Sequence, residues 1–189
     1  MGQYLESKPR YEILDGLRGV AAWVVVLYHL IECYPPEYVR MYFSHGYLAV
    51  DFFFALSGFV IGYAYVDRWS KMSLKDFFKR RIVRLHPMVV FGAMVGLCLF
   101  YYTGGMELFG KVDGAAWWMV LLQAFLMILM IPLPASMDIR GWGELTSLNG
   151  PVWTLMFEYV ANIFYALVLR HLSKLVLGIF VILSAILTA

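Results

Sequence analysis

Residues 14–32 read LDGLRGVAAWVVVLYHLIE and place two ionisable side chains, Arg18 and His29, inside an otherwise apolar stretch. A charge within a membrane-spanning segment is costly, so such residues are functional candidates by default. Eleven positions make about three helical turns, which puts both side chains on one face, roughly 16 Å apart along the axis. That separation is too long for a direct hydrogen bond and predicts two separate polar sites along one face.

Each of the two residues also has a simpler structural explanation. Arg18 could extend its long side chain back to the lipid headgroups, or pair locally with Asp15 three residues earlier. His29 could be a neutral histidine bonded to a backbone carbonyl, or a general base or proton relay, because histidine titrates near neutral pH. The sequence leaves these alternatives open.

The composition is typical of an integral membrane protein. Hydrophobic residues make up 62% of the 189 residues and charged residues 15%, and the mean hydropathy is +0.72. Crossing a bilayer takes about 20 apolar residues, and runs of this kind predict an all-α, polytopic membrane helix bundle of roughly five or six transmembrane helices. We expect the apolar segments at about residues 13–33, 47–66, 86–102, 115–131, 151–169 and 172–189.

The positive charges predict the orientation in the membrane. Seven of the fifteen Lys and Arg residues fall in residues 68–84, so this segment and the N-terminus should be cytoplasmic and the loop of residues 34–46 outside. If segment 115–131 crosses the membrane, the basic residues near position 170 fall outside, against the rule. If it is short or re-entrant they fall inside. A spanning helix needs about 17 residues at least, so this choice stays open.

The arginine cluster of the basic segment has two interpretations. Arg80, Arg81 and Arg84 lie just before a predicted helix that starts near His86-Pro87. They could set the topology and contact anionic lipid. They could instead bind the phosphates of a donor molecule, because guanidinium groups match phosphate oxygens. Arg81 and Arg84 are three residues apart, so we expect them to share a helix face.

Glu158 and Asn162 lie one turn apart inside the fifth predicted helix, on one face. An intramembrane carboxylate is a functional candidate by default. The alternative is that Glu158 pairs with an arginine or histidine inside the membrane.

Four segments, taken in order and spacing, resemble the membrane-bound acyltransferase 3 family of O-acyltransferases that modify surface glycans. They are LDGLRG…YH with Arg18 and His29, FFFALSGFVI at 52–61, RRIVRLHP with Arg80, Arg81 and Arg84, and PVWTLMFEYVANIFY with Glu158. The resemblance runs from about residue 13 to residue 169.

The resemblance implies an enzyme that moves an acyl group, commonly acetyl, from cytoplasmic acyl-CoA to a hydroxyl of a carbohydrate at the outer face. Arg18 and His29 would form the catalytic motif. Arg18 would guide the thioester end or stabilise charge there, and His29 would act as general base or transient acyl carrier. The arginine cluster would hold the donor, and Glu158 would orient His29 or the acceptor.

The resemblance also implies one membrane domain over residues 1–189. The family's domain is usually longer, and this chain stops inside the apolar run ILSAILTA, so we expect it to match the N-terminal half, truncated at its C-terminus. We expect the lipid bilayer, acyl-CoA (acetyl-CoA above all) and a carbohydrate as partners, no nucleic acid and no metal. The expected location is the cell inner or plasma membrane, with a cytoplasmic N-terminus.

Two other function classes remain open. In a proton- or ion-coupled transporter, the intramembrane Arg, His and Glu residues would act as relays, and inverted repeats, which would favour it, are not seen. The chain could also be an inactive truncated relative with a structural role.

Overall fold

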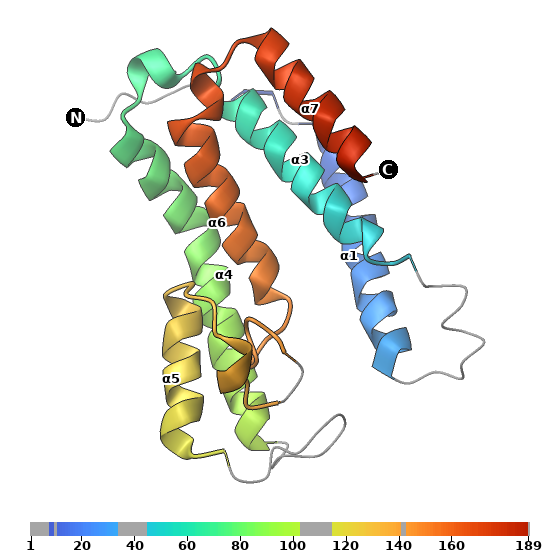
Figure 1. The fold of residues 1–189 in the computed structure, drawn as a ribbon, viewed down its shortest axis with the longest axis vertical. Coiled ribbons are helices and arrows are strands. Elements are labelled where there is room, and N and C mark those ends of the chain that lie inside the picture. The colour runs from blue at the N-terminus through green and yellow to red at the C-terminus, as the bar shows by residue number, and fades with distance from the viewer. Residues whose placement is uncertain (1–7, 10, 34–44, 103–114, 141–142, 189) are drawn as a thin grey trace. The chain divides into compact units, whose positions relative to one another are not determined.

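The computed structural model describes residues 8–9, 11–33, 45–102, 115–140 and 143–188. These residues form helices and connecting turns, with no β-strand among them. Within the described residues, four helices are long and apolar enough to cross a membrane, which confirms the predicted all-α membrane fold (Figure 1). The chain divides into two compact units, residues 1–72 and 73–189, and each is described by itself.

The first unit is a pair of contacting helices, α1 (Glu12–Cys33) and α3 (Leu48–Tyr65). Both match the predicted segments to within one residue at each end. Ala21 of α1 and Leu56 and Ile61 of α3 are buried, while the other apolar side chains are exposed on much of α1 and mostly half-buried on α3. Such incompletely buried apolar faces are expected of helices that face lipid or further protein. A short 3₁₀ turn, η1 (Trp69–Lys71), follows α3. The predicted loop of residues 34–46 lies almost wholly outside the described residues.

In the second unit, α4 (Leu74–Tyr102) begins well before the predicted start at His86. Ser73 and Asp76 form a capping box, because the Asp76 N–H donates to the Ser73 Oγ at 3.1 Å and the Ser73 N–H donates to the Asp76 carboxylate at 3.4 Å. One side chain per turn is then buried against the rest of the unit: Phe77, Arg81, Leu85 and Val89. The basic segment is therefore the first part of a 29-residue helix.

Pro87 explains why the start of α4 was predicted wrongly from the sequence. Proline is favoured in the first turn of a helix, and that preference predicted a start beside it. In the structure Pro87 lies inside α4. Its missing N–H removes one backbone hydrogen bond, a defect that membrane helices tolerate when neighbouring elements compensate. The prediction was wrong about the start of this helix, and the described part of α4 extends to Tyr102.

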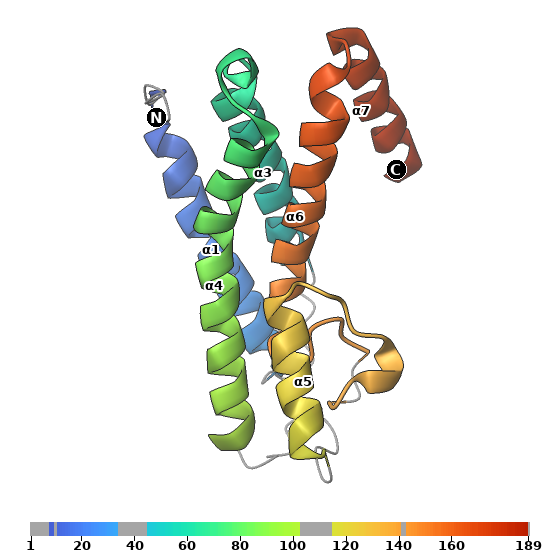
Figure 2. The same cartoon turned by 90° about the vertical axis from the view of Figure 1, so that its left-hand side faces the viewer.

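Two further helices pack on α4, namely α5 (Trp117–Ile128) and α6 (Val152–Leu167). Figure 2 shows α5 beside the second half of α4. The apolar core joins both helices and the connection between them: Val89, Ala93, Phe100, Val120, Ala124, Met127, Ile139, Leu148 and Val152. With 12 residues, α5 is shorter than the predicted segment 115–131.

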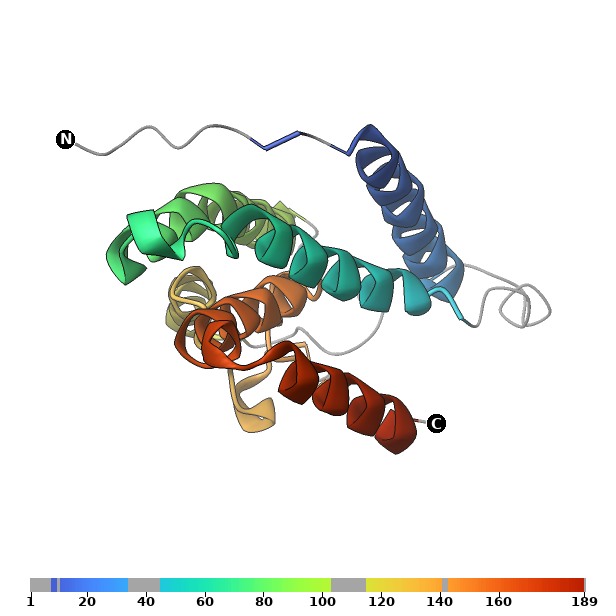
Figure 3. The same ribbon diagram turned by 90° about the horizontal axis from the view of Figure 1, so that it is seen from above.

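The rest of the unit consists of short turns and a final helix. One 3₁₀ turn, η2 (Ala135–Met137), lies in the connection after α5, and another, η3 (Leu169–His171), follows α6. The last helix, α7 (Lys174–Thr188), leaves the end of α6 at an angle (Figure 3). None of its described side chains is buried.

Candidate functional site

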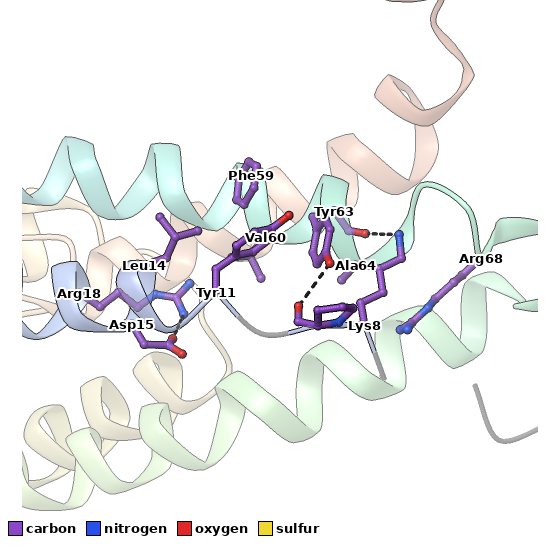
Figure 4. A pocket seen from close by; sticks show the side chains of 11 residues that line it. Lys8, Tyr11, Leu14, Asp15, Arg18, Phe59, Val60, Tyr63, Ala64 and Arg68 are labelled. Atoms are coloured by element: carbon purple, nitrogen blue, oxygen red, sulfur yellow. Dashed lines mark hydrogen bonds and ion pairs between the residues drawn. The ribbon is translucent and has the colours of Figure 1, made fainter. Parts of the chain in front are cut away.

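Arg18 lines a pocket of about 500 Å³ within the first unit, between the start of α1 and the end of α3. The cationic residues of its lining are Lys8, Arg18 and Arg68, and the aromatic ones are Tyr11, Phe59 and Tyr63. Figure 4 shows Arg18 and Asp15 toward one end and Lys8 and Arg68 toward the other, with the aromatic side chains between them. The pocket therefore has positive charge at both ends and an aromatic middle.

The Arg18 guanidinium is held only loosely. Its Nη1 donates to the Asp15 Oδ1 at 3.5 Å, and the two side chains are 30% and 33% exposed. This is the local pair considered from the sequence. A long, partly exposed ion pair contributes little to stability, typically about 0–1 kcal/mol. The geometry leaves the guanidinium accessible to an anion that enters the pocket.

Residues 8–9, which precede α1, are tied to the end of α3. The Lys8 Nζ donates to the Tyr63 carbonyl at 2.7 Å and to the Asp67 carboxylate at 2.5 Å, and it lies 4.9 Å from the centre of the Tyr63 ring. In return, the Tyr63 hydroxyl donates to the Pro9 carbonyl at 3.3 Å. These contacts hold a cation beside an aromatic ring at this end of the pocket.

The aromatic side chains of the pocket contact one another. The Phe59 and Tyr63 rings are stacked, with centroids 6.0 Å apart, and the Tyr11 ring meets Tyr63 edge-on at 5.1 Å. Rings in these arrangements offer flat faces and edges for a planar ligand group. Together with the cations, they suit a ligand that carries both phosphate and an aromatic ring.

His29 is on the same helix as Arg18 but is not part of the pocket lining. Its side chain is exposed, and its ring stands edge-on to the Tyr28 ring with centroids 5.4 Å apart. The structure therefore keeps Arg18 and His29 as two separate sites along α1, as their spacing predicts.

The second unit brings together Arg81 of α4 and Glu158 of α6. The Arg81 Nη2 donates to the Glu158 Oε1 at 2.5 Å, and the two side chains are 3% and 20% exposed. Of the two roles considered for Glu158, the structure shows the pairing with an arginine. Arg80 and Arg84 are both exposed. Arg81 and Arg84 lie about one turn apart on α4, but Arg81 falls in the buried stripe of the helix, whereas Arg84 falls at its exposed edge.

The polar face of α6 continues one turn beyond Glu158. Asn162 is buried, and its Nδ2 donates to the Glu158 carbonyl at 2.6 Å, so the two residues lie on one face as predicted. Beside them, the Tyr159 hydroxyl lies 3.4 Å from the His86 Nδ1 of α4. Nothing in the sequence of either helix alone predicts this second contact, because it joins residues 73 positions apart.

Most of the pocket lining was not predicted from the sequence, including Lys8, Tyr63 and Arg68. Arg68 could have been found, since it follows directly on the aromatic end of α3, in the run YAYVDR. Lys8 and Tyr63 are brought together by tertiary contacts over 55 positions. Within the described residues, no group of three or more His, Cys, Asp or Glu side chains is arranged to hold a metal ion.

Comparisons with known proteins agree with this architecture. The sequence model of a family described as an acyltransferase domain matches residues 11–189. Protein 2 in the picA locus of Rhizobium radiobacter is 32% identical over 171 residues, which cover 85% of this chain and 84% of that protein.

A second relative is O-acetyltransferase OatA of Staphylococcus aureus, 39% identical over 87 residues. That match covers 44% of this chain and only 13% of the staphylococcal protein. No solved structure matches the chain.

Proposed function

This chain belongs to the acyltransferase 3 family of membrane-bound O-acyltransferases, and from that premise we propose that it transfers an acetyl group from acetyl-CoA to a hydroxyl of a carbohydrate. The pocket of the first unit carries the proposal. Coenzyme A combines phosphate groups with an adenine ring and a long, flexible arm that ends in the thioester. Cations at both ends of an aromatic pocket suit the phosphates and the ring.

We assign the roles along α1 as follows. Lys8 and Arg68 bind the phosphates, and Arg18 guides the donor arm toward His29. The arm is needed because Arg18 and His29 are roughly 16 Å apart along a regular helix. His29 accepts the proton of the acceptor hydroxyl while the hydroxyl oxygen attacks the thioester carbonyl. The carbon–sulfur bond breaks, and the thiolate of coenzyme A leaves and takes up that proton.

The three arginines of the cluster have different roles in this proposal. Arg80 and Arg84 are exposed and remain candidates for attracting the donor. Arg81 and Glu158 hold α6 against α4, since each is the other's partner in a largely buried pair. Glu158 is therefore a positioning residue in this scheme.

The acetyl group, the carbohydrate acceptor and the orientation in the membrane are each proposed on different grounds. The staphylococcal relative is named an O-acetyltransferase, which supports an acetyl group and an oxygen acceptor. The carbohydrate acceptor follows from the family resemblance alone. A cytoplasmic N-terminus follows from the basic residues 68–84, and the cell inner or plasma membrane follows from the family resemblance. We also propose that residues 1–189 act as one membrane domain that corresponds to the N-terminal half of the family's domain.

The test separates donor binding from chemistry in membranes that contain the full-length protein. Arg18→Ala should raise the KM for acetyl-CoA by roughly ten- to a hundredfold, because a hydrogen bond to a charged group contributes about 1.5–3 kcal/mol. His29→Ala should abolish acetyl transfer while acetyl-CoA still binds. Arg170→Ala removes an arginine outside the pocket and serves as the control.

Three outcomes would contradict the proposal. Wild-type turnover in His29→Ala would remove the catalytic role of that residue. An unchanged KM for acetyl-CoA in Arg18→Ala would show that the donor does not bind in this pocket. Proton or ion flux without acetyl transfer would favour the transporter class instead.

A further inference from the structure

α5 has a defined end within the apolar part of the chain. Met130 has a positive φ of 57°, its N–H donates to the Met127 carbonyl at 3.0 Å, and the N–H of Ile131 donates to the Leu126 carbonyl at 2.9 Å. These bonds form a Schellman motif, which satisfies the last carbonyls of a helix without water. Pro132 then prevents the helix from continuing. With 12 residues, α5 is about 18 Å long, well short of a hydrocarbon core of about 30 Å.

The connection that follows α5 packs against the apolar centre of α4. Between Arg84 and Tyr102, α4 has no Asp, Glu, Lys or Arg, and this stretch of about 27 Å nearly matches the thickness of the hydrocarbon core. Gly92 and Gly96 lie near its middle. They provide a notch without side chains on one face of α4.

Two contacts hold residues 148–149 of the connection in this notch. The Asn149 Nδ2 donates to the Gly92 carbonyl at 3.1 Å. The Leu148 carbonyl lies so close to Gly96 that a Cβ at position 96 would overlap it. Leu148 is only 3% exposed and belongs to the core with residues of α4 and α5. Irregular backbone therefore reaches the middle of the most apolar part of α4.

Protein groups satisfy the polar backbone of this connection. The buried Gln123 of α5 donates to the Met137 carbonyl. The Asp138 carboxylate accepts from three backbone N–H groups, those of Arg140, Gly143 and Glu144. Non-helical backbone at membrane depth is tolerated only where protein or trapped water satisfies it, and these bonds satisfy one carbonyl and three N–H groups of the connection.

α6 then runs back toward the start of α4. Val152, its first residue, shares the core with Val89 of α4, and near its other end the Tyr165 ring lies 6.1 Å from the ring of Phe77. α6 therefore runs antiparallel to α4, as Figures 1 and 2 also show.

We propose that residues 117–151 form a re-entrant element that enters the membrane with α5, turns at Met130, is held at mid-depth by Gly92 and Gly96, and does not cross. Residues 115–116 before α5 and 132–140 after it then face the side of Tyr102. α6 is the next crossing helix, and it brings Arg170, His171 and Lys174 to the side of the basic segment 68–84, in agreement with the positive-inside rule. This topology does not depend on the proposed acetyl transfer.

Four single-cysteine variants test the proposal in full-length protein whose Cys33 and Cys98 are replaced by Ser. The reporters are Ser70→Cys, Ala116→Cys, Ser136→Cys and Ser173→Cys, labelled with an impermeant maleimide from each side of the membrane. The re-entrant element predicts that positions 116 and 136 label from one side and positions 70 and 173 from the other. A crossing α5 would separate 116 from 136 and would place 173 with 116, and that pattern would overturn the proposal.

A matched pair of glycine variants tests the notch. Gly96→Ala places a Cβ against the Leu148 carbonyl, whereas Gly178→Ala on α7 meets nothing within 4 Å. Ser147→Cys, at a side chain that is 1% exposed, reports undocking by its labelling rate. We expect about a tenfold faster rate with Gly96→Ala, which corresponds to about 1.4 kcal/mol, and no change with Gly178→Ala. Equal rates in both would show that the notch does not hold the connection.

Discussion

The two units hold their arginine residues in opposite ways. In the first unit, Arg18 is 30% exposed at the edge of a pocket and meets Asp15 at 3.5 Å. In the second, Arg81 is 3% exposed and bonds Glu158 at 2.5 Å. Burial commits the guanidinium of Arg81 to contacts within the protein, such as that with Glu158, whereas exposure leaves that of Arg18 accessible to a ligand. The comparison teaches that burial, rather than membership of a motif, separates an arginine that holds the fold from one that can bind a donor.

The largest expected effect tests the buried pair. Glu158→Ala leaves the Arg81 charge buried without its carboxylate, and breaking such a pair typically costs about 3–5 kcal/mol. We expect a loss of this size in the free energy of unfolding, measured by denaturant titration in detergent. Glu12→Ala, at an exposed position of α1, is the control and should have little effect.

A double variant sharpens this prediction. Arg81→Leu combined with Glu158→Leu removes both charges and should recover most of the lost stability, because an apolar pair of similar volume often replaces a buried ion pair without loss. If Glu158→Ala alone were as stable as the wild type, the contrast between the two arginine residues would fail.

The second prediction concerns the pocket of the first unit. Arg68→Ala should raise the KM for acetyl-CoA about tenfold, equivalent to about 1.4 kcal/mol, while the unfolding free energy stays within about 0.5 kcal/mol of the wild-type value. Lys71→Ala, at a nearby exposed cation outside the pocket lining, should leave the KM unchanged. A loss of stability without a change in KM would make Arg68 a structural residue, like Arg81.

The third prediction concerns the start of α4. Ser73→Ala removes the side chain that accepts the Asp76 N–H and should lower the unfolding free energy by about 1 kcal/mol. The KM for the donor should stay the same, because this residue lies outside the pocket. Ser70→Ala, in the preceding 3₁₀ turn, is the matched control. Equal stability of the two variants would mean that the capping box does not fix where α4 begins.

The smallest effect is expected at the open pair. Asp15→Asn removes the carboxylate that meets Arg18, and a partly exposed pair contributes only about 0.2–1 kcal/mol. The KM for acetyl-CoA should fall slightly, because the guanidinium loses a competitor for the incoming phosphates. A clear rise in KM would show that Asp15 positions Arg18 for binding.

The sequence predicts the helices of this chain well where apolar patterning alone decides them. α1 and α3 match their predicted limits to within one residue, because each is a single apolar run between polar or helix-breaking residues. α4 does not, since its first turns depend on a capping box and on a buried arginine whose partner lies 77 positions away. Segment 115–131 has about the smallest length that can cross a membrane, so the sequence leaves open whether it crosses, and in the structure the turn at Met130 ends α5 early.

The candidate site, like the helices, could be predicted only in part from the sequence. Arg18, Arg81 and Glu158 stand out in the sequence because they are charges in or beside apolar helices. Which of them line a pocket and which pair with each other depends on tertiary contacts. The contacts of Lys8 with the end of α3 likewise join residues far apart in the sequence, and no local periodicity predicts them.

The length of α4 has an electrostatic consequence. Its 29 residues make about 43 Å of helix, some 13 Å more than the hydrocarbon core of a bilayer, so roughly a third of it must lie in the headgroup layer. The end that protrudes is the charged one, with Lys75, Lys79, Arg80 and Arg84 exposed on it. Anionic leaflets have a negative surface potential that repels polyanions, and basic side chains at the surface locally offset it. A phosphate-bearing molecule diffusing along the membrane therefore meets less repulsion at this helix end than over bare lipid.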